Sequence, residues 1–150
     1  MDRIPSFSKN HDYLLCGLHK SMEMHGITTW DLRFKKPNAG DYITPKALHT
    51  IEHLLATTLR NSDKRDLVIY FGPMGCRTGF YLLTAELDRE AVIELLIASC
   101  KAALALDEIP GNKREECGNY LEHDLDGARK EIENYIEILY GEPKADGVKP

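Results

Sequence analysis

The chain has 150 residues, of which 43% are hydrophobic and 29% charged, and its formal net charge at pH 7 is −5. This length allows one domain with one hydrophobic core, and the negative charge argues against a nucleic-acid partner, because phosphate binding needs a basic surface. No apolar run reaches the ~18 residues of a membrane span, and the first residues lack the apolar segment of a secretion signal. We therefore expect a cytoplasmic protein without a membrane partner.

The N-terminal half predicts an irregular segment over residues 1–12, two strands and a helix. Residues 14–24 mix apolar and polar positions, and residues 28–34 alternate with the two-residue period of a half-buried strand. Thr44 and Pro45 are typical of a helix start, because threonine caps the first turn and proline needs no hydrogen-bond donor there. This helix should end near residue 59 or 60.

The C-terminal half predicts a hairpin and two further helices. Residues 66–71 and 80–85 are short apolar strands around a glycine-rich loop. Asp88 caps a helix to about residue 106, Pro110 and Gly111 interrupt the chain, and a last helix spans residues 124–140. The order of elements predicts one α+β domain over residues 1–150, with an antiparallel sheet packed against helices and a loose tail from residue 141.

The strongest local signal is the sequence His49-Thr50-Ile51-Glu52-His53 inside the first predicted helix. Four residues are about one helical turn, so both imidazoles project from one face of the helix. Two nitrogen ligands at this spacing can hold one divalent metal ion, and Glu52 lies within reach of anything bound there. The pair borders an apolar stripe, so we expect it to be half-buried at the edge of a pocket.

A third ligand is needed. The candidates are the four cysteines, many carboxylates and the histidines at positions 11, 19, 25 and 123, and the cysteines differ in their surroundings. Disulfides are not expected without a secretion signal, and no pair has C-x-x-C spacing. Cys100 lies in an apolar run and Cys16 in a predicted strand, so both are predicted to be structural, whereas Cys117 lies in a polar segment that suits a ligand. Cys76 follows Gly-Pro-Met-Gly at the hairpin tip, where a fixed backbone presents one side chain, and Arg77 would supply a positive charge beside it.

An ordered set of motifs resembles the S-ribosylhomocysteine lyase (LuxS) family. It comprises the H-x-x-E-H sequence, residues 73–79 (PMGCRTG), residues 116–118 (ECG), residues 123–125 (HDL) and residues 30–34 (WDLRF), and it extends from residue 6 to about residue 140. The resemblance implies a homodimer with two active sites at the subunit interface. It also implies one divalent metal per subunit, iron(II) in the native state and often zinc or cobalt after isolation.

The resemblance also implies a reaction and roles. The family cleaves the thioether of S-ribosylhomocysteine to homocysteine and 4,5-dihydroxy-2,3-pentanedione, the precursor of the bacterial signal autoinducer-2, by carbonyl migration and β-elimination. The reaction also recycles a by-product of methyl transfer. By this resemblance His49, His53 and Cys117 are the metal ligands, and Glu52 and Cys76 are the acid–base pair.

Three further residues match positions that line the substrate site of that family: Ser6, His11 and Arg33. Of these, Ser6 and His11 are expected to reach across from the partner subunit. The chain departs from the family pattern at Tyr70 and Gly72, where better-known members often have aspartate and serine. A substrate contact made by that aspartate has no matching carboxylate at residue 70, and backbone groups or the Tyr70 hydroxyl are the candidates to replace it.

Two other functions are compatible with the H-x-x-E-H sequence. A zinc peptidase uses this inverted sequence with Glu52 activating water and a downstream glutamate as third ligand, for which the candidates are Glu122, Glu131 and Glu133. A metal-storage or structural-metal protein would have a closed site with four ligands. The Cys76 loop and Cys117 have no role in a peptidase, so the lyase is the favoured hypothesis.

Overall fold

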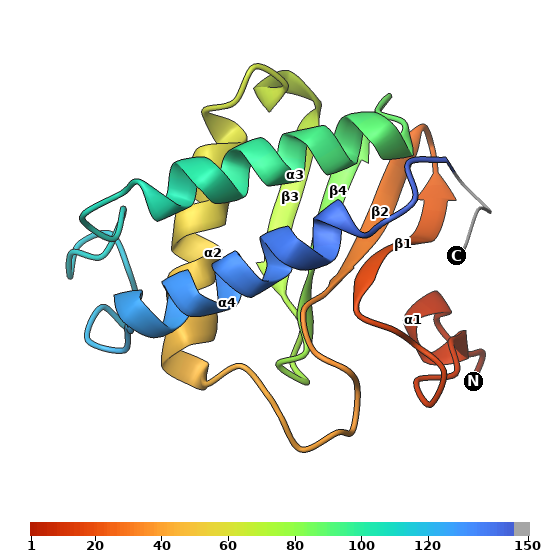
Figure 1. The fold of residues 1–150 in the computed structure, drawn as a ribbon, viewed down its shortest axis with the longest axis horizontal. Helices are drawn as coiled ribbons and strands as arrows, with labels where there is room; N and C mark the ends of the chain where they lie inside the picture. The colour runs from red at the N-terminus through yellow and green to blue at the C-terminus, as the bar shows by residue number, and fades with distance from the viewer. Residues whose placement is uncertain (146–150) are drawn as a thin grey trace.

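The computed structural model describes residues 1–145, and the chain forms one four-stranded antiparallel sheet with helices on one face. Its elements are α1 (Pro5–Ser8), β1 (Gly17–Met24), β2 (Ile27–Arg33), α2 (Pro45–Arg60), η1 (Arg65–Leu67), β3 (Val68–Pro73), β4 (Gly79–Ala85), α3 (Arg89–Leu104) and α4 (Leu125–Tyr140). The strands lie in the order β1-β2-β4-β3, and α2, α3 and α4 pack over them (Figure 1). This confirms the predicted α+β class.

The two faces of the sheet differ because successive side chains of a strand point in opposite directions. Trp30 and Leu32 of β2 pair with Leu82 and Phe80 of β4, and all four side chains are buried in the core beneath the helices. The residues between them lie on the opposite face, where Asp31 pairs with Tyr81. Of the two groups of functional residues described below, one includes Arg33 at the end of β2, and the other includes His49 and His53 of α2.

Helix α2 begins and ends where its sequence requires. The Thr44 hydroxyl accepts a hydrogen bond from the Ala47 N–H at 3.2 Å, and Pro45 occupies the first turn. One side of the helix is buried in the core through Ile51, Leu54, Leu55 and Leu59. The flank carrying the two histidines is only half-buried, as the sequence predicted.

Two boundaries differ from the sequence prediction. A single helical turn, α1, lies within the segment that was predicted to be irregular, and Pro5 stands at its start. One turn has no apolar periodicity, so the sequence could not reveal it. The first strand begins at Gly17 rather than at residue 14, because the preceding residues form turns over the edge of the sheet.

The chain beyond α4 is fastened to the start of β1 and α3. Arg89 is buried; it donates hydrogen bonds to the Leu18 carbonyl at 2.8 Å and the Pro143 carbonyl at 2.6 Å, and it pairs with Glu142. A side chain at Gly17 would overlap the Glu142 carboxylate. The predicted loose tail is therefore anchored at residues 142–143, and residues 146–150 lie outside the described part of the chain.

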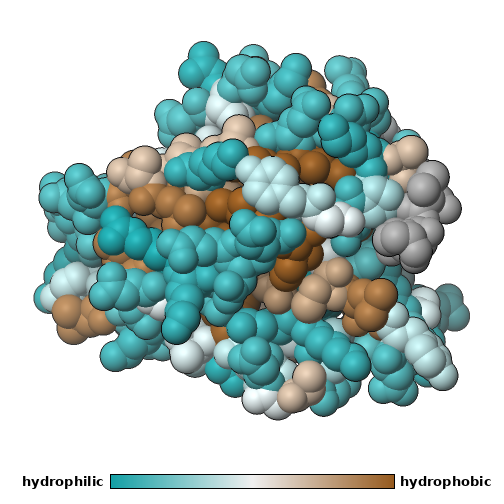
Figure 2. Space-filling view, in the orientation of Figure 1, coloured by the Kyte–Doolittle hydropathy of each residue, from teal (hydrophilic) through white to brown (hydrophobic). Residues whose placement is uncertain are grey.

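Helices α3 and α4 lie side by side on the outer face of the molecule. Several of their hydrophobic residues are only partly buried against the core, among them Ile97, Leu104 and Ile138. Figure 2 shows apolar surface between these helices, bordered by polar side chains. None of the helices within residues 1–145 combines the length and the apolar character needed to cross a membrane.

Candidate metal centre and active site

Four potential metal-binding side chains converge beside the middle of α2. His49 and His53 come from α2, and Cys117 and His123 come from residues 105–124, which connect α3 to α4 without a helix or strand. Their donor atoms all lie within 4.8 Å of one another, and each residue is half-buried. The predicted set of His49, His53 and Cys117 is thus brought together, with His123 as a fourth donor.

The hydrogen bonds of the two α2 histidines fix which ring nitrogen is free. His49 Nδ1 lies 2.7 Å from the Glu122 carbonyl and His53 Nδ1 lies 2.8 Å from the Pro110 carbonyl. A carbonyl can only accept, so each Nδ1 carries the hydrogen and each Nε2 keeps its lone pair. The two Nε2 atoms face each other at 3.1 Å, with the Cys117 sulfur 3.4 and 3.7 Å away. The two imidazole lone pairs repel each other and the single thiol hydrogen can satisfy only one of them, so their convergence suits a cation.

The ring of His123 is oriented in the same way. The Thr50 hydroxyl donates to the Lys46 carbonyl and accepts from the Asp124 N–H, so His123 Nδ1 donates to it at 2.9 Å. His123 Nε2 is buried without a hydrogen-bond partner among the described residues. Burial, followed by the proximity of the α2 histidines, lowers the pKa of His123 to about 4, so it is neutral at pH 7. The sequence had placed His123 among the candidate third ligands and within the motif at residues 123–125.

A cavity of about 340 Å³ opens beside the metal-binding cluster and is bordered by Glu52, His53 and Tyr70. The Glu52 side chain is half-buried, and among residues 1–145 it has no hydrogen bond or ion pair. A carboxylate that is not committed to another protein group can accept and return protons from a ligand in this cavity.

The predicted acid–base cysteine lines a second cavity, of about 370 Å³. Cys76 is exposed at the tip of the β3–β4 hairpin. The other polar side chains around this cavity belong to Ser6, His11, Arg33 and Tyr81. Ser6, His11 and Arg33 are the residues that the sequence assigned to substrate. They therefore gather around Cys76 within a single chain.

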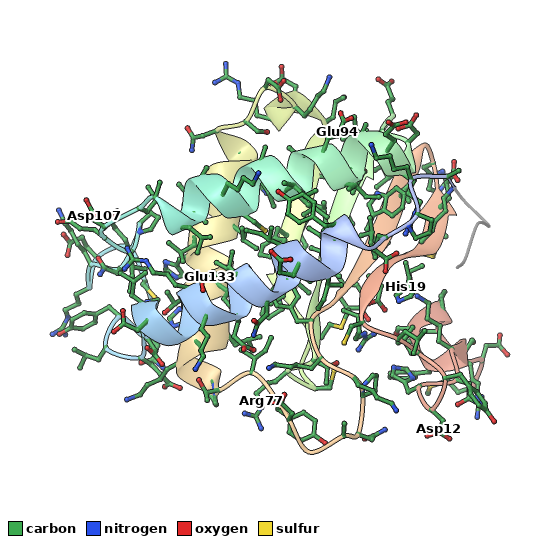
Figure 3. All side chains as sticks on the ribbon, viewed as in Figure 1. Asp12, His19, Arg77, Glu94, Asp107 and Glu133 are labelled. Atoms are coloured by element: carbon green, nitrogen blue, oxygen red, sulfur yellow. The ribbon has the colours of Figure 1, made fainter. Side chains whose placement is uncertain are left out.

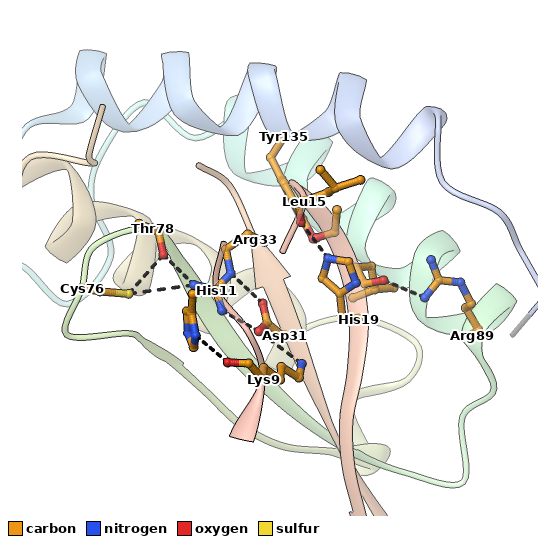
Figure 4. A network of polar contacts seen from close by, with 12 residues as sticks. Lys9, His11, Leu15, His19, Asp31, Arg33, Cys76, Thr78, Arg89 and Tyr135 are labelled. Atoms are coloured by element: carbon orange, nitrogen blue, oxygen red, sulfur yellow. Dashed lines mark hydrogen bonds and ion pairs between the residues drawn. The ribbon is translucent and has the colours of Figure 1, made fainter. Parts of the chain in front are cut away.

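A buried ionic network stands behind Cys76 (Figure 4). Arg33, which is 2% exposed, donates to both carboxylate oxygens of Asp31 at 3.1 and 2.6 Å and to the Thr78 hydroxyl at 2.6 Å. The same guanidinium lies 3.9 Å from the Cys76 sulfur. Lys9 of the N-terminal segment approaches Asp31 at 3.5 Å. Sequence reasoning singled out neither Asp31 nor Thr78, although both lie within motifs.

The positive charge beside Cys76 does not come from Arg77, as the sequence had suggested. Arg77 donates to the Ile43 carbonyl at 3.1 Å and lies over the Tyr42 ring, and Figure 3 places it at the edge of the molecule, near the connection between β2 and α2. Its φ of 60° turns this residue of the loop away from the cavity. Arg33 provides the charge instead.

The two positions that depart from the family pattern are in contact. A Cβ atom on Gly72 would overlap the hydroxyl and ring of Tyr70, so the absence of a side chain at residue 72 makes room for the tyrosine. Tyr70 borders the cavity near Glu52 and also a cavity of about 320 Å³ on the open face of the sheet. The latter shares Ser6 and Tyr81 with the cavity around Cys76.

The glutamates that a peptidase would use as its third ligand are placed elsewhere. Glu122 offers its carbonyl to His49, while its carboxylate accepts from Asn119 at 2.8 Å. Glu131 pairs with Lys35 at 3.0 Å, and Glu133 is exposed on α4 (Figure 3). Cys117 occupies the third position of the cluster, which does not favour the peptidase hypothesis.

Comparison with known proteins gives one consistent result. Residues 4–144 match the family model described as S-Ribosylhomocysteinase (LuxS). The chain is 44% identical over 150 residues to the S-ribosylhomocysteine lyase of Phocaeicola vulgatus, covering 93% of this chain and 91% of the relative. It is 42% identical over 146 residues to that of Borreliella afzelii, with 93% of both covered, and 36% identical over 156 residues to that of Finegoldia magna, with 100% and 99% covered.

Proposed function

The chain belongs to the S-ribosylhomocysteinase (LuxS) family, and we propose that it cleaves S-ribosylhomocysteine to homocysteine and 4,5-dihydroxy-2,3-pentanedione, the precursor of autoinducer-2. The observation that carries this proposal is the convergence of the lone pairs of His49 and His53 with the Cys117 sulfur beside an uncommitted Glu52. A thioether next to a sugar requires that kind of site, because its carbon–sulfur bond breaks readily only after a carbonyl has moved close to it.

We propose that His49, His53 and Cys117 hold a divalent ion, iron(II) by family resemblance. Two imidazoles and one thiolate are a donor set that suits first-row divalent metals, and three protein ligands leave a position for substrate. His123 stacks on His49 with ring centroids 4.0 Å apart, and we assign it to supporting that ring. The bound ion would supply Lewis-acid chemistry at the sugar oxygens.

The reaction consists of a series of proton transfers and the cleavage of the carbon–sulfur bond. In each of two isomerisations, a base removes the proton from the carbon beside the carbonyl, a proton returns to the former carbonyl carbon, and the hydroxyl proton passes to the former carbonyl oxygen. Two such steps move the carbonyl from C1 to C3. Removal of the C4 proton then forms the C4–C5 double bond, and the C5–S bond breaks with its electron pair leaving on sulfur. The thiolate takes a proton, and the enol becomes the diketone.

We assign these transfers to Cys76 and Glu52. Both are general acid–base groups that border cavities, and the Arg33 guanidinium lies 3.9 Å from the Cys76 sulfur. Ser6, His11 and the remaining Arg33 N–H are proposed to bind the substrate, because they share the cavity with Cys76. Glu52 then acts from helix α2, and Cys76 acts from the tip of the β3–β4 hairpin.

We propose that the complete site forms between two copies of the chain. The hydrogen bonds of Cys76 stay with Arg33 and Thr78, and its cavity shares no lining residue with the cavity beside Glu52. Between them lies the open face of the sheet, where Tyr70 and Leu83 line the largely apolar cavity of about 320 Å³. A second copy packed on this face would bring the Cys76 cavity of one subunit to the metal ligands of the other.

Complementation between inactive variants tests this arrangement. His49→Ala and Cys76→Ala are prepared separately and then mixed after reversible dissociation. If each site combines the metal of one subunit with Cys76 of the other, about half of the randomly mixed dimers carry one intact site, giving about a quarter of wild-type activity. Mixtures that remain inactive, although mixed dimers form, would contradict the shared site.

The activity itself is tested by incubating the protein with S-ribosylhomocysteine and measuring thiol release with a chromogenic disulfide. Wild type should release homocysteine, whereas Cys76→Ala should be slower by at least ~10²-fold with unchanged metal content. Cys16→Ala serves as the matched control, since the one hydrogen bond of its sulfur among the described residues goes to the Phe34 carbonyl. Wild type that releases no thiol in its metal-loaded form would refute the proposal.

A further inference from the structure

We infer that Thr78 is a positioning residue. Its hydroxyl holds the Cys76 sulfur ready to accept a proton and links that sulfur to the Arg33 guanidinium. This inference rests on the proposed catalytic role of Cys76. Thr78 lies on the connection into β4, two residues after Cys76, and its side chain is 2% exposed. Figure 4 shows its hydroxyl between the guanidinium of Arg33 and the sulfur of Cys76, with contacts to both.

The direction of each hydrogen bond follows from what the groups can donate. Arginine has only donors, so the contact of 2.6 Å from Arg33 Nη1 makes the Thr78 hydroxyl an acceptor. The single proton of that hydroxyl is therefore free, and the sulfur of Cys76 lies 3.1 Å away. When Cys76 is a thiolate, Thr78 donates to it, and the neighbouring cation strengthens this bond by polarising the hydroxyl.

The hydroxyl also suits a cysteine that changes its protonation state. A neutral thiol sulfur can still accept from the Thr78 hydroxyl, and its own hydrogen can point into the cavity because Cys76 is exposed, so the contact of 3.1 Å persists. The Arg33–Thr78 bond does not change between these states. A proton can thus leave and return to Cys76 without any buried group losing its partner.

The surrounding charges make Thr78 the main route by which Arg33 acts on the sulfur. The contact from Arg33 to Cys76 is long, at 3.9 Å, and the Asp31 carboxylate on β2 neutralises much of the guanidinium charge. From the N-terminal segment, Lys9 adds a positive charge at Asp31, and His11 lines the cavity with its Nδ1 directed to the Lys9 carbonyl. The short link through the hydroxyl is the stronger connection.

Alkylation of Cys76 tests the inference without using lyase activity. The metal-loaded protein is treated with iodoacetamide over a series of pH values without substrate, and modification at Cys76 is quantified on the peptide by mass spectrometry. Thr78→Val removes the hydroxyl but keeps the shape, and Thr78→Ala removes it without demanding any repacking. Thr78→Ser restores the hydroxyl. Thr84→Val is the matched control, because it removes a second buried threonine hydroxyl, on β4, which accepts from Trp30 at 2.9 Å.

The expected result is an upward shift of the pH midpoint of alkylation by about one to two units in Thr78→Val and Thr78→Ala, which is the size expected for a lost hydrogen bond to a charged group. Thr78→Ser and Thr84→Val should keep the wild-type midpoint, and kcat of Thr78→Val should fall while KM changes little. Wild-type midpoints in both hydroxyl-free variants, or an equal shift in Thr84→Val, would overturn the inference. The lyase assay of Cys76→Ala decides the proposed function separately.

Discussion

His49 and His53 each use one ring nitrogen to hold the chain and leave the other for a ligand. The carbonyls of Glu122 and Pro110 fix the hydrogen on Nδ1, so both rings have the tautomer and orientation that a metal ligand needs. The helical spacing of these histidines was readable from the sequence because it is local. The positions of the carbonyls were not, since Glu122 and Pro110 lie 73 and 57 residues later in the chain than the histidines that they contact.

At this scale, the ligand assignment predicts different outcomes for two neighbouring substitutions. Cys117→Ala removes a proposed ligand and should lose most of the bound metal, whereas His123→Ala removes a ring that packs on His49 and should retain it with lower affinity. Metal per chain, measured by elemental analysis after extensive dialysis, compares the two. A stoichiometric, tightly bound metal in Cys117→Ala would show that the third ligand is wrongly assigned.

The elements that the sequence predicted are those with local signals. Helix α2 has its cap and proline, and β2 has a clear two-residue alternation. The network of Arg33, Asp31 and Thr78 could not be predicted, because it depends on the register that places Arg33 opposite Gly79 across β2 and β4. The resemblance to the family supplied Cys117, whose polar surroundings alone had left other ligands open.

The contact between Tyr70 and Gly72 gives a prediction for strand β3. Gly72→Ala should push the Tyr70 ring out of its place, and because this ring is half-exposed the ring can move into solvent, at a cost of only about 1 kcal/mol in unfolding free energy. The position of Tyr70 between two cavities should nevertheless raise KM. Steady-state kinetics and urea unfolding measure the two effects.

Tyr70→Ala combined with Gly72→Ala is the control for this prediction. With the ring removed, alanine at residue 72 should have no further effect on KM, so the two substitutions should be strongly non-additive. Additive effects would mean that the two residues act independently of their contact.

For the whole molecule, the buried acids predict instability at high pH. Burial raises the pKa of the Cys100 thiol from 9.0 to about 12, and burial also raises the pKa of Tyr135 well above its usual value. In the unfolded chain these groups lose their protons at their ordinary values, while the folded chain keeps them. Their contribution to stability is therefore complete below pH 9.0 and is lost as the pH rises toward about 12.

Cys100→Ala isolates the cysteine's share of this effect. Its unfolding free energy should fall less steeply above pH 9.0 than that of wild type, by up to about 1.4 kcal/mol per pH unit. Urea unfolding at neutral pH provides the reference, since the packing lost with the sulfur costs the same at every pH. Parallel stability curves for the two proteins across the alkaline range would contradict the pKa shift.

Each α2 histidine contacts a backbone carbonyl with Nδ1 and faces the proposed metal site with Nε2, and this arrangement has a consequence for limited proteolysis. Residues 105–124 are a long exposed stretch, and the ring of His53 fastens this stretch at Pro110 through the nitrogen that does not face the metal. His53→Ala should therefore release both the ion and this stretch, whereas Cys117→Ala should release only the ion. Two variants with equally little metal should then differ in limited proteolysis, with faster cleavage between residues 105 and 124 in His53→Ala.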